Sequence, residues 1–201
     1  MRLIKYKDFI KESIEVSVDF IKFRDYLVSH NVPVDVYGTG KYKTIGHLYK
    51  EIKDGETVLT EEDDILVRRV EFVGAKVVYK ATEGTLRLYE AKQVFKDGRV
   101  RVRDNMPYSA AEKFKAGEDL NEVLVRGMEE ELGIHVDPSQ FAFYNKKEVE
   151  NNDDYPGIRS FHIGHEYIVN LNKEQYKPEG YIERQDDKDV YFEWRPISVK
   201  K

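Results

Sequence analysis

The segment GEDLNEVLVRGMEEELGI, residues 117–134, constrains the fold most strongly, because it contains signals for both the start and the end of a helix. Asp119 and Glu122 form a D-x-x-E capping box, which favours a helix that begins directly after Asp119. Gly133 is the residue type that most often ends a helix in the left-handed conformation. An apolar stripe at helical spacing lies between these signals and consists of Leu120, Val123, Leu124 and Met128. The pattern predicts an amphipathic helix over residues 120–132.

Alternating apolar and polar residues on both sides of this helix predict β-strands. The predicted strands cover residues 65–81, 85–96, 99–104, 141–150, 159–171 and 189–197. Nearer the N-terminus, residues 19–30 and 45–53 have helical spacing, whereas Val32, Val34 and Val36 alternate as in a strand. Residues 172–188 are predicted to be a surface excursion. Strands before and after a central helix, with further helices N-terminal to them, predict a mixed α/β or α+β sandwich.

The acidic helix resembles the Nudix box, G-x5-E-x7-R-E-U-x-E-E-x-G-U, in which U is a bulky aliphatic residue. The matching positions are Glu118, Arg126, Met128, Glu130, Glu131, Gly133 and Ile134. The resemblance implies a Nudix-like α/β/α sandwich with a mixed sheet over residues 63–201. It leaves residues 1–62 as an N-terminal extension with helical character, and we place a boundary near residue 62.

Two positions of the box differ from the family pattern. Its first glycine falls at Glu112, and the glutamate after the arginine falls at Gly127. In the family that glutamate is a principal metal ligand or the catalytic base. A glycine inside a helix costs about 1 kcal/mol relative to alanine, so we expect a strand or a ligand to approach its backbone. A replacement base would have to come from elsewhere, and Glu112 is one candidate.

The resemblance implies the roles of the remaining box residues. Glu130 and Glu131 would hold Mg²⁺ or Mn²⁺, since carboxylate oxygens suit such hard cations. Arg126 would orient Glu118 or Glu130, and the four residues form the candidate catalytic set. A further acidic ligand often follows the box helix in the family, and the candidates here are Glu166, Glu179 and Glu183.

Arg99, Arg101 and Arg103 alternate with valines, so their side chains are predicted to share one face of a strand. Arginine presents a planar fork of donors that suits phosphate oxygens, which makes the three residues candidates for binding a diphosphate. A solvated strand face is the simpler explanation of the same pattern.

The overall composition excludes several classes of function. The chain has no cysteine, which rules out thiol catalysis and disulfides. Its net charge is −5, whereas binding to duplex nucleic acid needs a basic surface. No apolar run approaches the roughly 20 residues of a membrane-spanning helix, and no signal peptide is recognisable. We therefore expect a cytoplasmic protein that binds neither membranes nor duplex nucleic acid.

Two hypotheses for the function follow. The first is a Nudix-like protein that binds a nucleoside-diphosphate-type ligand and hydrolyses its diphosphate weakly, because Gly127 replaces a box glutamate. The alternative is a catalytically inactive Nudix-fold module for ligand sensing or protein interaction, and a homodimer is possible in either case. The sequence leaves open whether the protein is an enzyme.

Overall fold

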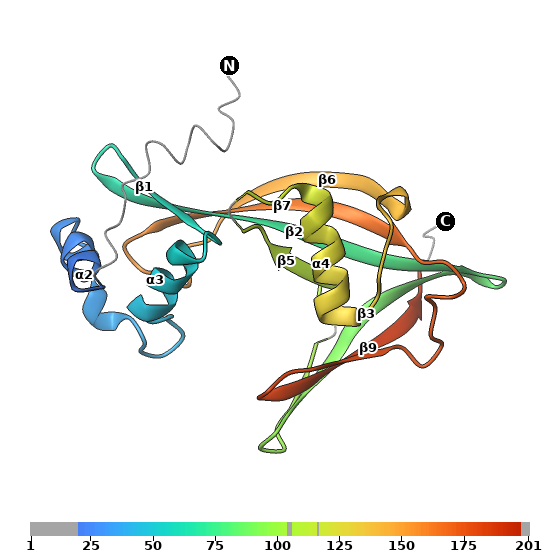
Figure 1. The fold of residues 1–201 in the computed structure, drawn as a ribbon. Coiled ribbons are helices and arrows are strands. Elements are labelled where there is room, and N and C mark those ends of the chain that lie inside the picture. Colours follow the sequence, from blue (N-terminus) through green and yellow to red (C-terminus); the bar gives the residue numbers. More distant parts are fainter. Residues whose placement is uncertain (1–19, 104–105, 116, 198–201) are drawn as a thin grey trace. The chain divides into compact units, whose positions relative to one another are not determined.

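The computed structural model describes residues 20–103, 106–115 and 117–197 of the chain. The helices are α2 (Phe20–Ser29), η1 (Val34–Val36), α3 (Ile45–Lys53), α4 (Leu120–Leu132) and η2 (Pro138–Gln140). The strands are β1 (Val58–Glu62), β2 (Ile65–Ala81), β3 (Gly84–Phe95), β4 (Val100–Val102), β5 (Ala110–Lys113), β6 (Phe141–Glu150), β7 (Arg159–Asn170), β8 (Tyr181–Arg184) and β9 (Lys188–Pro196). Figure 1 shows these elements in chain order from blue to red.

The chain divides into two compact units, and three long strands contribute residues to both. Among the described residues, unit 1 comprises 20–71, 114–115, 117 and 147–163. Unit 2 comprises 72–103, 106–113, 118–146 and 164–197. The shared strands are β2, β6 and β7. The domain boundary near residue 62 stays a prediction, and that position is the last residue of β1.

Unit 1 is built around α2 and α3, which are neighbours in Figure 1. Both helices lie where the apolar spacing predicts them, and each turns its apolar residues into one core. That core consists of Phe23, Leu27, Val32, Val34, Tyr37, Leu48, Leu59, Leu66, Tyr155 and Ile158. Helix α3 begins at a capping box, in which Thr44 accepts a hydrogen bond from the backbone N–H of His47. Unit 1 therefore has a hydrophobic core of its own.

The predicted strand at residues 32–36 is wrong. Residues Val34–Val36 form the 3₁₀-helix η1, in which the N–H of Tyr37 donates to the carbonyl of Val34. Pro33 has no N–H to donate to a neighbouring strand, and it adopts the N-cap position of η1 instead. Val32 and Val34 are still buried, so the alternation reflected contact with the core rather than pairing in a sheet.

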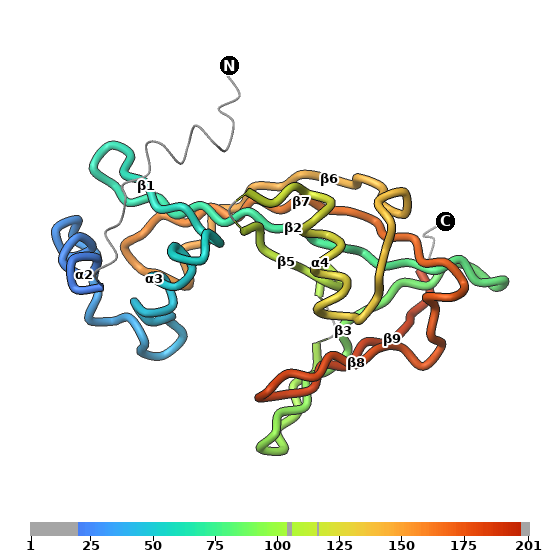
Figure 2. The backbone as a smooth tube through the Cα atoms, viewed as in Figure 1, coloured from blue at the N-terminus to red at the C-terminus, as the bar shows by residue number. Residues whose placement is uncertain are grey.

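In unit 2, α4 packs against β5, as Figure 1 shows, and also contacts β8. The helix has the predicted limits, with Asp119 as N-cap and Gly133 as C-cap at φ 63°. Its buried residues are Val123, Leu124, Gly127, Met128 and Leu132. In the same unit β5 pairs antiparallel with β2, β3 pairs with β4 and β9, and β8 pairs with β9. Figure 2 shows β8 beside β9.

The mixed α/β fold class predicted from the sequence is confirmed, and most of the long strands lie where they were expected. Strand β2 has the predicted limits, as does β6. The short strands β1 and β5 were not predicted, and the predicted surface excursion at residues 172–188 contains β8. Strand β5 reads AAEK, a sequence with low intrinsic β-propensity, so its pairing with β2 decides its structure. None of the described helices is long and apolar enough to cross a membrane.

Candidate functional site

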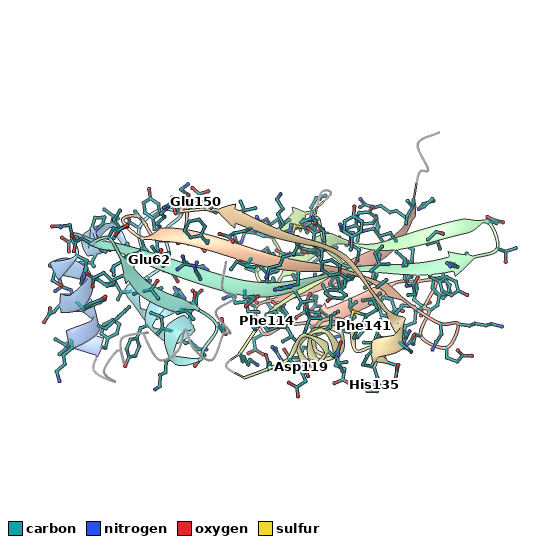
Figure 3. The ribbon with its side chains drawn as sticks, turned by 90° about the horizontal axis from the view of Figure 1, so that it is seen from above. Glu62, Phe114, Asp119, His135, Phe141 and Glu150 are labelled. Carbon is teal, nitrogen blue, oxygen red and sulfur yellow. The ribbon has the colours of Figure 1, made fainter. Side chains whose placement is uncertain are left out.

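Arg126 binds the loop that precedes α4 to the helix itself. Its guanidinium makes two hydrogen bonds to Glu118, with both donor–acceptor distances at 2.9 Å. Nη2 also donates to the carbonyl of Lys113 at 2.9 Å. Nη1 lies 2.9 Å from the carboxylate of Glu112, at an angle that makes the contact ionic rather than a hydrogen bond. Arg126 therefore joins β5, the loop and α4, and Figure 3 marks the two ends of this helix by Asp119 and His135.

The charge of Arg126 is stabilised by its neighbours. Burial lowers the pKa of the guanidinium, and the carboxylates of Glu118 and Glu112 raise it to a net value above the ordinary one. Glu122 was also a potential partner of Arg126 at helical spacing. It instead accepts a hydrogen bond from the N–H of Asp119 and completes the capping box.

Gly127 is a glycine because Glu112 occupies the space beside it. A Cβ atom at position 127 would lie 2.9 Å from the Cβ of Glu112, closer than real side chains come. Glu112 is on β5, where it pairs with Val73 of β2. The cavity left between β5 and α4 is only about 10 Å³, at the lower limit of what one water molecule needs. A strand residue, and not a ligand, therefore fills the gap over Gly127.

The two positions at which the box differs from the family pattern are thus in contact. The carboxylate absent from the helix at 127 is present on the adjacent strand at 112. Sequence reasoning named Glu112 as a candidate base, but it had no means of placing that residue beside Gly127, because the pairing of β5 was not predicted.

Glu131 is the most perturbed carboxyl group of the site. Its Oε1 accepts a hydrogen bond from the backbone N–H of Ala111 at 2.9 Å. Burial raises the pKa of Glu131 to about 8, against the effect of that hydrogen bond. The carboxylates of Glu183, Glu112 and Glu90 raise it further. Carboxylates from β8, β5 and β3 therefore oppose the ionisation of Glu131 on α4.

Glu130 does not share the partners of Glu131. Its carboxylate lies 3.6 Å from Nη1 of Arg126, and its side chain is 56% exposed. Among the described residues no group of three or more acidic or histidine side chains has the geometry to hold a metal ion. The donor set itself is composed of carboxylate oxygens, which suits Mg²⁺ or Mn²⁺. The assignment of Glu130 and Glu131 as metal ligands therefore stays a prediction.

The three arginines of the predicted phosphate clamp have different surroundings. Arg99 is 72% exposed and pairs with Asp97 in the hairpin between β3 and β4. Arg101 is exposed on β4. Arg103 is 21% exposed, lies 3.5 Å from Glu90 and contacts the sulfur of Met106. Since Glu90 also acts on Glu131, Arg103 is the member of the three that is linked to the carboxyl groups of the site.

The acidic residues after the box helix that were candidate metal ligands have different surroundings. Glu183 on β8 raises the pKa of Glu131, which places its charge near the helix. Glu166 is instead engaged by Lys76 at 3.0 Å and by the hydroxyl of Tyr108 at 2.8 Å. Glu90 was missed, because it lies in the middle of a strand with no motif around it. Its only sequence signal was the alternation that β3 shares with every half-buried strand.

The matched box residues form a loop, a helix and a turn, with Arg126 bound to Glu118 and the helix packed on a sheet of the same unit. The residues that match the Nudix box thus have the loop–helix–turn structure that the resemblance implies. The sequence matches no protein-family model and no curated protein.

Similar solved structures include several Nudix proteins. The C. elegans Ap4A hydrolase is 12% identical, with a TM-score of 0.36, over 63% of this chain and 79% of that one. The E. coli dihydroneopterin triphosphate pyrophosphohydrolase is 13% identical, with a TM-score of 0.38, over 62% and 78%. A MutT/nudix family protein from Enterococcus faecalis is 10% identical, with a TM-score of 0.40, over 96% of this chain and 56% of that one.

Proposed function

We propose that this Nudix-like chain binds a nucleoside-diphosphate-type ligand beside α4 and hydrolyses its diphosphate weakly with Mg²⁺ or Mn²⁺. The observation that carries the proposal is the position of Glu112 over Gly127. The carboxylate of Glu112 on β5 takes the place of the box glutamate that is missing at Gly127. The number of acidic side chains at the site is therefore kept, although one of them comes from a strand and not from the helix.

The charges around Glu131 support a cation at this site. A carboxyl group whose pKa is raised by burial and by Glu183, Glu112 and Glu90 is held in an unfavourable environment when ionised. A divalent cation would relieve that repulsion, neutralise the charge of the diphosphate and lower the pKa of a bound water. Arg126 fixes Glu118 and Glu112, and Arg103 lies on the Glu90 side, where it can donate to phosphate oxygens.

Two features support the expectation that hydrolysis is weak. The ion pair with Arg126 holds the carboxylate of Glu112, so a cation competes with a guanidinium for it. A pKa of about 8 also keeps Glu131 largely protonated at neutral pH until a cation displaces the proton. Affinity at oxygen sites rises with the number of charged ligands, so we expect at best millimolar binding of Mg²⁺ by the free protein.

The same two features favour the alternative, a catalytically inactive module that binds a nucleotide-derived ligand. In that case Arg126, Glu112 and Glu118 are a structural network, and the ligand is bound without turnover. Calorimetry that detects ADP-ribose binding without any product in the same sample, at saturating Mn²⁺, would favour this alternative.

Exchange of the two altered positions tests the proposal. The variants are Glu112→Gln, Gly127→Glu and the double substitution Glu112→Gly with Gly127→Glu. Each is assayed for Mn²⁺ binding by electron paramagnetic resonance and for turnover of ADP-ribose, dinucleoside polyphosphates and nucleoside triphosphates. Thermal melts of each variant report whether the fold is kept.

Glu112→Gln should lose Mn²⁺ binding and any turnover, while the fold remains intact. Gly127→Glu alone should melt much lower, since its side chain meets Glu112. The double variant has room for the helical carboxylate and should recover stability and exceed the wild-type rate. Wild-type turnover and Mn²⁺ binding that survive Glu112→Gln unchanged would refute the role of Glu112.

A further inference from the structure

Unit 1 contains a cavity of about 210 Å³ that the box residues do not reach. Its lining consists of Lys43, His47, Lys50, Glu51 and Glu56. His47, Lys50 and Glu51 are three or four residues apart on α3 and share one face of it, and Lys43 lies just before the N-cap Thr44. Sites that enclose drug-sized ligands usually exceed about 300 Å³. The cavity therefore suits a small ligand or the charged end of a larger one.

Glu51, an acidic residue in the lining of this cavity, forms ion pairs with Arg68 and Lys43. Oε2 of Glu51 lies 2.6 Å from Nη2 of Arg68, whose side chain is only 1% exposed. Oε1 of Glu51 lies 3.1 Å from Nζ of Lys43, which also pairs with Asp154 at 3.0 Å. Nε and Nη1 of Arg68 are buried with no hydrogen-bond partner among the described residues. Arginine keeps its charge in proteins, so Arg68 offsets the negative charge of Glu51.

His47 lines the cavity and takes part in the capping box of α3. The backbone N–H of Thr44 donates to Nδ1 of His47 at 3.3 Å, and the Thr44 hydroxyl lies 3.0 Å from the same nitrogen. Because Nδ1 acts as the acceptor of the capping box, the proton of the neutral ring is on Nε2. Nε2 is therefore the ring nitrogen that can donate a hydrogen bond to a ligand.

Lys50 supplies a further cation. Its side chain is 73% exposed and pairs with Asp54 one helical turn later. An exposed pair of this kind holds its partners weakly, and an ammonium group has three donors. His47 and Lys50 thus place two donors on α3, and Lys43 adds a third from the segment before the helix. Glu56 places an acceptor at the same cavity.

We propose that this cavity binds a phosphate monoester. The phosphate oxygens accept hydrogen bonds from Lys43, His47 and Lys50, and a hydroxyl of the attached group donates to Glu56. A phosphate offers three strong acceptor oxygens and close to two negative charges, which matches three donors, two of them cationic. The site shares no residue with the α4 site, so it stands independently of the hydrolysis proposed there.

Phosphorus-31 NMR and calorimetry on the full chain test the proposal, with inorganic phosphate, ribose 5-phosphate and sulfate as probes. Lys50→Gln should weaken ribose 5-phosphate binding about tenfold, the loss of one charge-assisted hydrogen bond. Lys53→Gln is the matched control, because Lys53 is on the same helix but does not line the cavity. It should change the affinity by less than about twofold. His47→Gln should weaken binding while it keeps the cap, since glutamine is the usual residue at this position of a capping box.

Glu56→Gln distinguishes the contribution of the ligand's hydroxyl to binding from that of its phosphate. It should weaken ribose 5-phosphate, whose hydroxyl loses an ionised acceptor, and leave inorganic phosphate unchanged or tighter. Circular dichroism and melts check that each variant is folded. Equal effects of Lys50→Gln and Lys53→Gln, or sulfate binding as tight as that of ribose 5-phosphate, would mean non-specific anion attraction and overturn the proposal. Absence of binding at millimolar ribose 5-phosphate would overturn it as well.

Discussion

Each unit contains an arginine that is largely or fully buried, and the two arginines differ in the number of carboxylates that neutralise them. Arg126 in unit 2 has a side chain that is 18% exposed, and Glu118 and Glu112 both bind its guanidinium. Arg68 in unit 1 is 1% exposed and pairs with a single carboxylate, that of Glu51. Two of the nitrogens of Arg68 have no partner among the described residues.

This difference predicts which arginine tolerates the loss of one of its partners. Arg126 retains a second carboxylate and a backbone carbonyl when one partner is removed. Arg68 has no other carboxylate at ion-pair distance among the described residues, so its buried charge would keep the ring of Tyr155, 5.0 Å away, but no ionic partner. A buried ion pair contributes little net stability, whereas breaking it is costly. We therefore expect the larger effects in unit 1, although the recognisable motif is in unit 2.

The largest effect is expected for Glu51→Ala. It leaves Arg68 buried and unpaired, which should lower the free energy of unfolding by about 3–5 kcal/mol. Urea denaturation measures the loss. Glu51→Gln is the matched control, because it keeps a hydrogen-bond acceptor, and it should cost less. A double variant, Glu51→Leu with Arg68→Met, should recover most of the stability. A loss below about 1 kcal/mol in Glu51→Ala would show that Arg68 is not dependent on this partner.

A smaller effect is expected for Arg126→Ala. The carboxylates that it leaves, Glu118 and Glu112, are 20% and 23% exposed and can be solvated in part. We expect a loss of about 2 kcal/mol, above the 0.5 kcal/mol or less of an exposed helical pair. Arg126→Lys is the control, and it should recover only part of the loss, since lysine cannot bind Glu118 through two parallel hydrogen bonds. An unchanged urea midpoint for Arg126→Ala would contradict the structural role.

The comparison also separates what the sequence could predict from what it could not. Helix α4 was predictable to the residue, because its cap, its apolar stripe and its terminal glycine are local signals. The resemblance to the Nudix box named Glu118 or Glu130 as the partner of Arg126, and the structure shows the closer contacts with Glu118. The contact between Glu112 and Gly127 was not predictable, since it depends on the pairing of β5 with β2, and β5 carries no strand signal of its own.

The network around Arg68 had even less signal. Arg68 lies in a long alternating strand, Glu51 on a helix and Asp154 in a loop, and the three are brought together only by tertiary contacts. The strand predicted at residues 32–36 was wrong for a related reason. The alternation of its valines reflects burial in the core of unit 1 and not pairing in a sheet. Local patterns thus identified the elements, while the partners of charged residues required the fold.

The free energy of unfolding should depend moderately on pH, and we expect the ionisation of Glu131 to cause this dependence. Its pKa is about 8 in the folded chain against an ordinary value of 4.5, so folding favours its protonated form. The stabilisation is complete below about pH 4.5 and is lost as the pH rises through 8. From pH 7 to pH 9 the wild type should lose on the order of 1 kcal/mol more than Glu131→Gln. The amide keeps an acceptor for the N–H of Ala111 and has no proton to lose.

Thermal melts at several pH values measure this difference, with Glu129→Gln as the control on the same helix. Glu129 is exposed and pairs with His135, so its substitution should leave the slope between pH 7 and pH 9 close to that of the wild type. Parallel curves for the wild type and Glu131→Gln would contradict the burial of an ionisable proton at this position.

The smallest effect is expected for Arg99, and it tests the phosphate clamp within unit 2. Arg99 and Asp97 are 72% and 54% exposed, so Arg99→Ala should change the free energy of unfolding by less than about 0.5 kcal/mol. Arg103 is mostly buried beside Glu90, so Arg103→Ala should cost more. Calorimetric titration with ADP-ribose and Mn²⁺ distinguishes their roles in binding. If only the arginine linked to the acidic groups contacts a diphosphate, Arg103→Ala weakens binding while Arg99→Ala leaves it within about twofold. Equal weakening by both substitutions would instead support a clamp formed by the whole strand face, as the alternation in the sequence first suggested.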